Sequence, residues 1–131
     1  MTTGLVLQDL LEEVMASEAG FPASFYARLF VSHPELKPMF HRSSPDAQQK
    51  MFAQKLMLLV DAIDSPERLR RELQEVANTH RAYGITREMY DWVGEALVGS
   101  VADALKGRMT VEQRAALTGA WQTMTTIIFE C

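Results

Sequence analysis

Signals that start a helix recur along this chain, and they constrain its fold more than any other feature of the sequence. A serine, a proline and an acidic residue stand together at Ser44-Pro45-Asp46 and at Ser65-Pro66-Glu67. There the serine hydroxyl can accept a hydrogen bond from a free amide of the first turn, and proline suits the first helical position. Thr110 and Gln113 have the spacing of a capping box, and Pro22 marks a fourth start. These signals predict a chain built from helices.

Patterns typical of β-hairpins are missing from the sequence. It contains no Asn-Gly or Asp-Gly pair and no sustained alternation of apolar with polar residues. Apolar residues recur instead at intervals of three and four, as they do on the buried face of a helix. Gly84 and Gly107 follow two such runs and indicate helix ends. We therefore predict an all-α fold with helices at about 4–19, 21–32, 45–63, 66–83, 87–106 and 110–129.

Length and composition favour one globular domain, residues 1–131. A chain of 131 residues can bury one core and is too short for two. Its 47% hydrophobic and 23% charged residues are ordinary for a globular protein. The net charge of −4, without a run of Lys or Arg, gives no surface for nucleic acid or for an anionic membrane. We expect neither partner.

Two further features bear on location and redox chemistry. The apolar run Leu56–Val60 is far shorter than the roughly 20 residues that a membrane-spanning helix needs, and no basic start with an apolar block precedes it. We therefore expect a cytoplasmic protein. The one cysteine, Cys131, excludes an internal disulfide and a multi-cysteine zinc site, and we expect it to be a solvent-exposed tail thiol.

A histidine stands on the apolar stripe of the helix predicted at 66–83. The stripe steps by four, three, four and three residues through Leu69, Leu73, Val76, His80 and Tyr83. A neutral imidazole facing a core needs a partner for each nitrogen or a metal for one of them, because an unpaired buried polar group costs about 1 to 3 kcal/mol. The stripe alone leaves two interpretations open, a core histidine bonded to a carbonyl and a metal ligand.

Two groups of motifs extend the argument beyond this histidine. The segment Phe25–Phe30 (FYARLF) is followed by His33–Glu35 (HPE) and by Phe40, and the segment His80–Ile85 (HRAYGI) is followed by Tyr90. In this combination the motifs resemble the second helix, the following corner and the proximal segment of bacterial single-domain globins, relatives of the globin domain of flavohaemoglobins. The resemblance spans about residues 25–105. It implies a globin-like fold of about six to seven helices that enclose a haem pocket.

The resemblance implies a cofactor and a ligand for its metal. The cofactor would be haem b, with His80 as the iron ligand, because an imidazole nitrogen suits iron and leaves the opposite face of the ring open for a gas. The implied function is reversible binding of dioxygen and other diatomic gases, such as nitric oxide and carbon monoxide. The residues implied in cofactor binding are Phe40, Phe52, Leu56, His80, Tyr83, Ile85, Tyr90 and Val93.

Tyr26 matches the distal tyrosine of the family, whose hydroxyl can donate a hydrogen bond to dioxygen. The second distal position depends on the alignment register. A count back from His80 without a gap places Gln48 at the polar distal site and Phe52 one turn later, against the ring. A rival register places Phe52 at the polar site and leaves Tyr26 as the sole donor. We favour Gln48, because the gapless count also keeps Ile63-Asp64 in place.

On the proximal side the resemblance implies that Tyr90 pairs with His80, so that the ligand becomes more basic. Relatives often add a carboxylate late in the last helix, but Glu130 falls one or two residues early for that role. Trp121 stands where relatives usually carry a tyrosine, and Leu117 stands where they carry a tryptophan. These departures argue against a strongly electron-donating, peroxidase-like site. The other two histidines, His33 and His41, stand at turns and are expected to be structural.

Three other functions are alternatives to gas binding: a nitric-oxide dioxygenase, a gas sensor and a helical interaction module. Flavohaemoglobins carry flavin and nicotinamide domains after the globin, whereas this sequence ends at residue 131. Nitric-oxide dioxygenation would therefore need an external reductase. A haem-based gas sensor would act through a signalling protein. A helical interaction module without cofactor would close its third and fourth helices on each other and leave no slot between them.

Overall fold

The computed structural model describes residues 2–17, 20–40 and 44–130, and this part of the chain is helical. Its elements are, in order, α1 (Thr3–Ser17), α2 (Phe21–Ser32), the 3₁₀ helix η1 (Pro34–Phe40), α3 (Pro45–Ala62), α4 (Pro66–Ala82), α5 (Arg87–Ala104) and α6 (Val111–Glu130). The predicted all-α class is confirmed. Among the described residues, no helix combines the length and apolar character needed to cross a membrane. His41 and Cys131 lie outside the described residues.

The helix starts follow the sequence signals, with one exception. The Ser44 hydroxyl accepts a hydrogen bond from the amide of Ala47 at 3.2 Å. Thr110 and Gln113 form the reciprocal capping box, with distances of 3.0 Å and 2.9 Å. The expectation for Ser65 was wrong, because its side chain makes no capping hydrogen bond. Proline at the first position and the backbone carbonyl of Ser65 still begin α4 there.

Helix ends are less accurately predicted than starts. The helices expected to end at residues 63, 83 and 106 end at 62, 82 and 104, and η1 was not predicted. The helix end expected at residue 19 lies outside the described residues. At the end of α4, Gly84 takes a φ of 72°, the amide of Ile85 donates to the His80 carbonyl at 3.2 Å, and the amide of Gly84 donates to Arg81 at 3.1 Å. This Schellman motif ends the helix at a position that apolar periodicity cannot locate.

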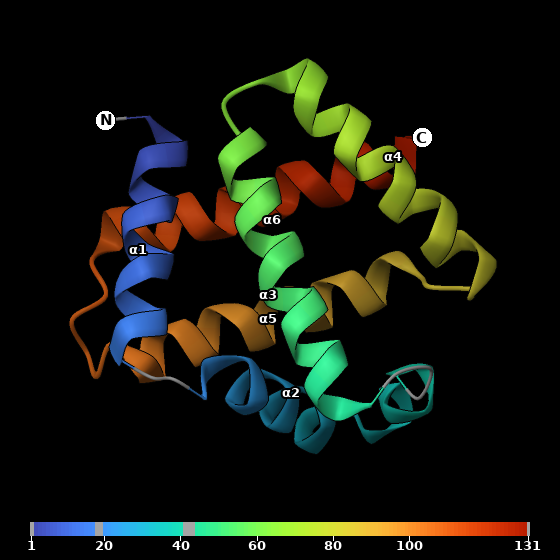
Figure 1. The fold of residues 1–131 in the computed structure, drawn as a ribbon, viewed down its shortest axis with the longest axis horizontal. Coiled ribbons are helices and arrows are strands. Elements are labelled where there is room, and N and C mark those ends of the chain that lie inside the picture. The colour runs from blue at the N-terminus through green and yellow to red at the C-terminus, as the bar shows by residue number, and fades with distance from the viewer. Residues whose placement is uncertain (1, 18–19, 41–43, 131) are drawn as a thin grey trace.

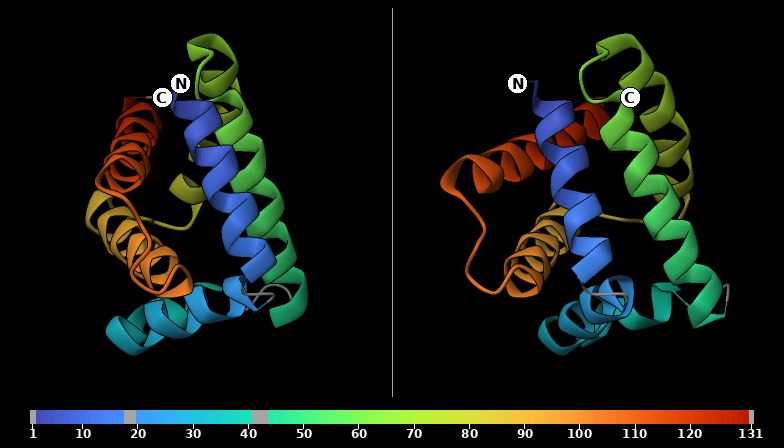
Figure 2. Two further views of the ribbon diagram at one scale, coloured as in Figure 1. Left: turned by 90° about the vertical axis from the view of Figure 1, so that its left-hand side faces the viewer. Right: turned by 60° about the vertical axis from the view of Figure 1, so that its left-hand side comes forward.

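The helices form two layers that are closed at one end (Figures 1 and 2). α1 and α3 lie side by side in one layer, α5 and α6 form the other, and α2 crosses the end of both. α4 packs against α6 and α3. Helices far apart in the sequence therefore meet, as α1 and α6 do. The short turn between α4 and α5 also brings the end of α4 close to the start of α5.

The buried side chains form two clusters, and α3, α5 and α6 contribute to both. The first cluster joins α1, α2, α3, α5 and α6, and its largest fully buried members include Leu7, Leu10, Leu11, Phe21, Phe25, Leu29 and Leu97. The second contains Leu59, Ala62, Leu69, Leu73, Ala77, Tyr90, Met124 and Ile128. Tyr90 belongs to the second cluster, whereas Val93, one turn further on α5, packs against the first. The predicted site residues are therefore divided between two cores.

A close approach of α5 and α6 positions Tyr90. The indole of Trp121 lies against Gly94, and its Nε1 donates a hydrogen bond to the Tyr90 carbonyl at 2.8 Å. A Cβ at Gly94 would lie 2.5 Å from two atoms of that indole. Glycine is needed here because no side chain fits between the two helices.

We expect Gly94→Ala to lower the free energy of unfolding by about 1 to 3 kcal/mol, because the added methyl group overpacks the contact with Trp121. Gly119→Ala is the matched control in a neighbouring helix. A Cβ at Gly119 meets nothing within 4 Å, so alanine should raise stability by up to about 1 kcal/mol. Urea denaturation measures both changes. A Gly94→Ala protein as stable as the unchanged chain would contradict this packing.

Candidate functional site

His80 lies near the C-terminal end of α4, on the side of the helix that faces α3. The fully covered residues of α4 are Leu69, Leu73 and Ala77, whereas Val76 and His80 are only half-buried. The predicted stripe is therefore buried in its first half. In its second half, Val76 and His80 line a hollow on the surface of the protein.

The hollow lies between α3 and α4 and has a volume of about 360 Å³, within the range of about 300 to 1,000 Å³ that ligand pockets occupy. It is lined by Met51, Gln54, Lys55 and Leu58 from α3 and by Glu75, Val76, Thr79 and His80 from α4. An ion pair between Lys55 and Glu72, with an N to O distance of 3.7 Å, joins the two helices. α3 and α4 thus pack together in the second core through residues such as Ala62 and Leu73, and they separate at this hollow.

The two nitrogens of the His80 ring have different surroundings. Nδ1 makes a hydrogen bond with the hydroxyl of Tyr90, and the ring centroids lie 5.6 Å apart. Nε2 has no hydrogen-bond partner within residues 2–17, 20–40 and 44–130. Burial lowers the pKa of the His80 imidazole and so favours its neutral form. When Nδ1 carries the proton and donates it to Tyr90, Nε2 presents a lone pair suited to a metal.

Tyr90 is itself held in place by α6. Burial raises the pKa of its phenol well above the ordinary value, so the hydroxyl keeps its proton. Trp121 bonds its backbone carbonyl, and the ring of Phe129 meets the Tyr90 ring edge-on at a centroid distance of 5.4 Å. Sequence reasoning missed this support from Trp121. A glycine inside a helix, Gly94, was the signal that another segment packs closely there.

Glu130 and Leu117, two of the α6 residues considered for the proximal side, have contacts other than Tyr90. Glu130 forms an ion pair with Arg70 on α4, at 3.1 Å between Oε2 and Nη2. Leu117 is buried in the first cluster, at 3% exposure. The contacts of Tyr90 with α6 are therefore made by Trp121 and Phe129.

A second group of predicted residues lies in the first core. Tyr26 is 7% exposed and its hydroxyl shares a hydrogen bond with the side chain of Gln48. Burial raises the pKa of the Tyr26 phenol, and the bond with Gln48 offsets part of that rise. Phe52 meets the Tyr26 ring edge-on at 5.6 Å and stacks on Phe25 at 4.5 Å. Gln48 and Phe52, both on α3, are therefore neighbours of Tyr26, the first polar and the second aromatic.

The remaining predicted residues surround these two groups. Leu56 is buried in the first cluster, and Val93 is half-buried against it. Ile85 packs half-buried against the second cluster, and Tyr83 is half-buried at the end of α4. Phe40 ends η1, and its side chain lies outside what the structure describes. Of the predicted residues that are described, His80 lines the hollow. The sequence analysis did not assign its apolar neighbours Met51 and Leu58, which are 54% and 36% exposed.

His33 has the structural environment expected for it. Its ring stacks on Trp92 with a centroid distance of 4.1 Å and an interplanar angle of 9°. Its Nδ1 lies 3.4 Å from a carboxylate oxygen of Glu35. These contacts hold the corner between α2 and η1 against Trp92 of α5.

Comparisons with known proteins point to one family. The Globin family model matches residues 23–128. Flavohemoprotein of Rhizobium meliloti (strain 1021) is 32% identical over 106 residues, which cover 79% of this chain and 26% of the relative. For Flavohemoprotein of Rhodopirellula baltica the identity is 27% over 118 residues, 88% of this chain and 29% of the relative. Flavohemoprotein B of Dictyostelium discoideum is 30% identical over 100 residues, 76% and 24% respectively. The chain spans about a quarter of the length of these curated relatives.

Replacing Gln48 should change the acidity of Tyr26. In Gln48→Leu we expect the pKa of Tyr26 to rise further, because the hydrogen bond that lowers it is lost while the burial that raises it remains. Gln49→Leu is the matched control on the next position of α3 and should leave the pKa unchanged. Fluorine NMR of protein labelled with 3-fluorotyrosine, whose phenol is more acidic, follows the titration. An equal pKa in both variants would contradict the contact.

Proposed function

Since the chain belongs to the globin family, whose model matches residues 23–128, we propose that residues 1–131 form one haem-binding globin domain. Its helices have the all-α globin fold. The cofactor is haem b, held between α3 and α4, with His80 as the ligand of the iron. The function is reversible binding of dioxygen and other diatomic gases by a cytoplasmic protein.

The observation that carries this proposal is the state of His80. A neutral imidazole lines a hollow, its Nδ1 is held by Tyr90, and its Nε2 has no partner among the described residues. Histidine is the usual proximal ligand of globin iron. When bound, haem would supply an iron that binds diatomic gases, and His80 would hold it. Tyr90 orients the imidazole, and when its hydroxyl oxygen accepts the hydrogen bond from Nδ1, Nε2 has a lone pair for a metal.

The lining of the hollow suits an amphipathic planar group. Met51, Leu58 and Val76 offer apolar surface, and methionine adapts to irregular shapes. Lys55 is paired with Glu72 at 3.7 Å and can turn from it toward a carboxylate at the edge of a porphyrin, whereas Glu75 is an acidic group of the same wall. We propose that Phe40, Phe52, Leu56, Tyr83, Ile85 and Val93 complete the contacts with the cofactor.

Tyr26 and Gln48 support the binding of a polar gas. Because burial raises its pKa, the Tyr26 phenol keeps its proton and can donate a hydrogen bond. The side chain of Gln48 holds that hydroxyl, and the ring of Phe52 restricts the phenol from one side. Dioxygen accepts such a hydrogen bond better than carbon monoxide does, so this pair would favour dioxygen.

Removing the proposed ligand should remove the cofactor. We expect His80→Ala to be purified nearly free of haem, whereas His33→Ala should keep near-normal haem content because His33 stacks on Trp92. The pyridine haemochrome assay measures haem per chain. Free imidazole should restore binding of added hemin to His80→Ala, which separates loss of the ligand from loss of the fold. Full haem content in His80→Ala would refute ligation by this residue.

Tyr26→Phe removes one hydroxyl and changes the volume little. A hydrogen bond to a strongly polarised acceptor contributes about 1.5 to 3 kcal/mol, so dioxygen should dissociate roughly ten- to a hundredfold faster. Release of carbon monoxide is the internal control and should change much less. Gln48→Leu should have a smaller effect of the same sign. Stopped-flow dissociation rates test this, and an unchanged dioxygen rate in Tyr26→Phe would show that the phenol does not reach the gas.

A further inference from the structure

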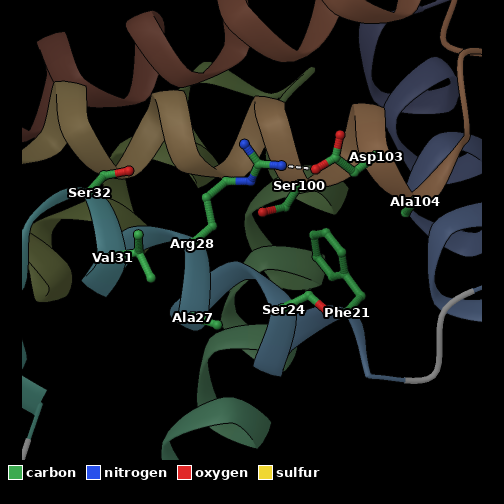
Figure 3. A pocket seen from close by; sticks show the side chains of 9 residues that line it. All are labelled: Phe21, Ser24, Ala27, Arg28, Val31, Ser32, Ser100, Asp103 and Ala104. Carbon is green, nitrogen blue, oxygen red and sulfur yellow. Dashed lines mark ion pairs between the residues drawn. The ribbon is translucent and has the colours of Figure 1, made fainter.

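A second hollow lies between α2 and α5 and does not involve His80 (Figure 3). Its volume is about 490 Å³. α2 contributes the rings and methyl groups of Phe21 and Val31 and the hydroxyl of Ser24, and α5 contributes Ser100 and Asp103. The globin function proposed above does not use this hollow.

Ser100 contributes a buried hydroxyl group to the lining of this hollow. The residue is 4% exposed, and its Oγ is the buried side-chain polar atom that lacks a hydrogen-bond partner within the described part of the chain. Helical hydroxyls commonly bond the carbonyl four residues earlier, as Thr125 does with Trp121 at 2.9 Å. Figure 3 shows the Ser100 hydroxyl turned instead into the space between Arg28 and Phe21. A buried hydroxyl without a partner is costly, so this one is suited to a ligand atom.

Arg28 supplies a cation beside that hydroxyl. Its guanidinium lies against the backbone of α5 at Gly99. The contact is so close that a Cβ added to this glycine would be 2.9 Å from Nη1 of Arg28. It forms an ion pair with the carboxylate of Asp103, whose side chain is 70% exposed. The carboxylate of Asp103 shows that a carboxylate can approach the guanidinium from the side of the hollow (Figure 3).

We propose that this hollow binds a small organic monocarboxylate with an aliphatic body. The ligand carboxylate takes the place of Asp103 on Arg28 and accepts a hydrogen bond from Ser100, while the body lies against Phe21 and Val31. The wall offers a guanidinium and serine hydroxyls as donors, with Asp103 as the competing carboxylate. Displacing Asp103 costs little, because ion pairs between exposed side chains are weak.

Calorimetric titration of the full chain with sodium butyrate, in a buffer low in chloride, tests this proposal. Arg28→Gln should weaken binding by up to about fivefold, because it removes a partly exposed ion pair with the ligand carboxylate. Asp103→Asn should tighten binding about two- to fivefold, because it removes the internal competitor. Arg70→Gln is the matched control, since Arg70 forms an ion pair with Glu130 away from this hollow, and it should leave the affinity unchanged.

Ser100→Ala separates a binding role from a structural one. We expect it to weaken butyrate binding without lowering the melting temperature, because the hydroxyl has no partner in the described structure. Three outcomes would overturn the proposal. The first is that butyrate binds neither the unchanged chain nor Asp103→Asn. The second is that leucine binds more tightly than butyrate and loses affinity in Asp103→Asn, which would indicate a zwitterion. The third is that inorganic phosphate binds as well as butyrate.

Discussion

The hydrogen bond between His80 and Tyr90 is the interaction on which the account of this molecule depends. It joins the end of α4 to the start of α5, and it occupies one ring nitrogen so that the other is available. Burial keeps both partners neutral, since it lowers the pKa of the imidazole and raises the pKa of the phenol. Without this bond the imidazole could rotate, and its free nitrogen would have no defined direction toward the hollow.

The position of Tyr90 depends in turn on the packing of α5 against α6. Trp121 fits against the bare backbone of Gly94 and bonds the carbonyl of Tyr90. The Schellman motif that ends α4 uses the His80 carbonyl as acceptor, so the backbone of this residue is also held. Three helices therefore determine where one imidazole lies. The pair of Tyr26 and Gln48 is held separately, in the first core, by Phe25 and Phe52.

Sequence reasoning was most accurate where the physics is local. The capping residues Ser44 and Thr110 and the turn at Gly84 act within a few residues, so the starts of α3 and α6 and the end of α4 were predicted closely. Ser65 shows the limit of that reasoning, because proline and a backbone carbonyl begin α4 without its hydroxyl. Contacts between residues that meet only in the folded chain could not be predicted from the sequence. The contact of Trp121 with Gly94, and the meeting of Arg28, Ser100 and Asp103, depend on how helices cross.

The central claim is that His80 binds the iron of a haem held between α3 and α4. The most direct test is the absorption spectrum of the purified chain with one equivalent of hemin, recorded as mixed, after reduction, and after reduction under carbon monoxide. We expect the spectrum of a protein-bound haem, which changes on reduction and changes again when carbon monoxide is added. A colourless protein whose added hemin keeps the spectrum of free hemin would contradict it.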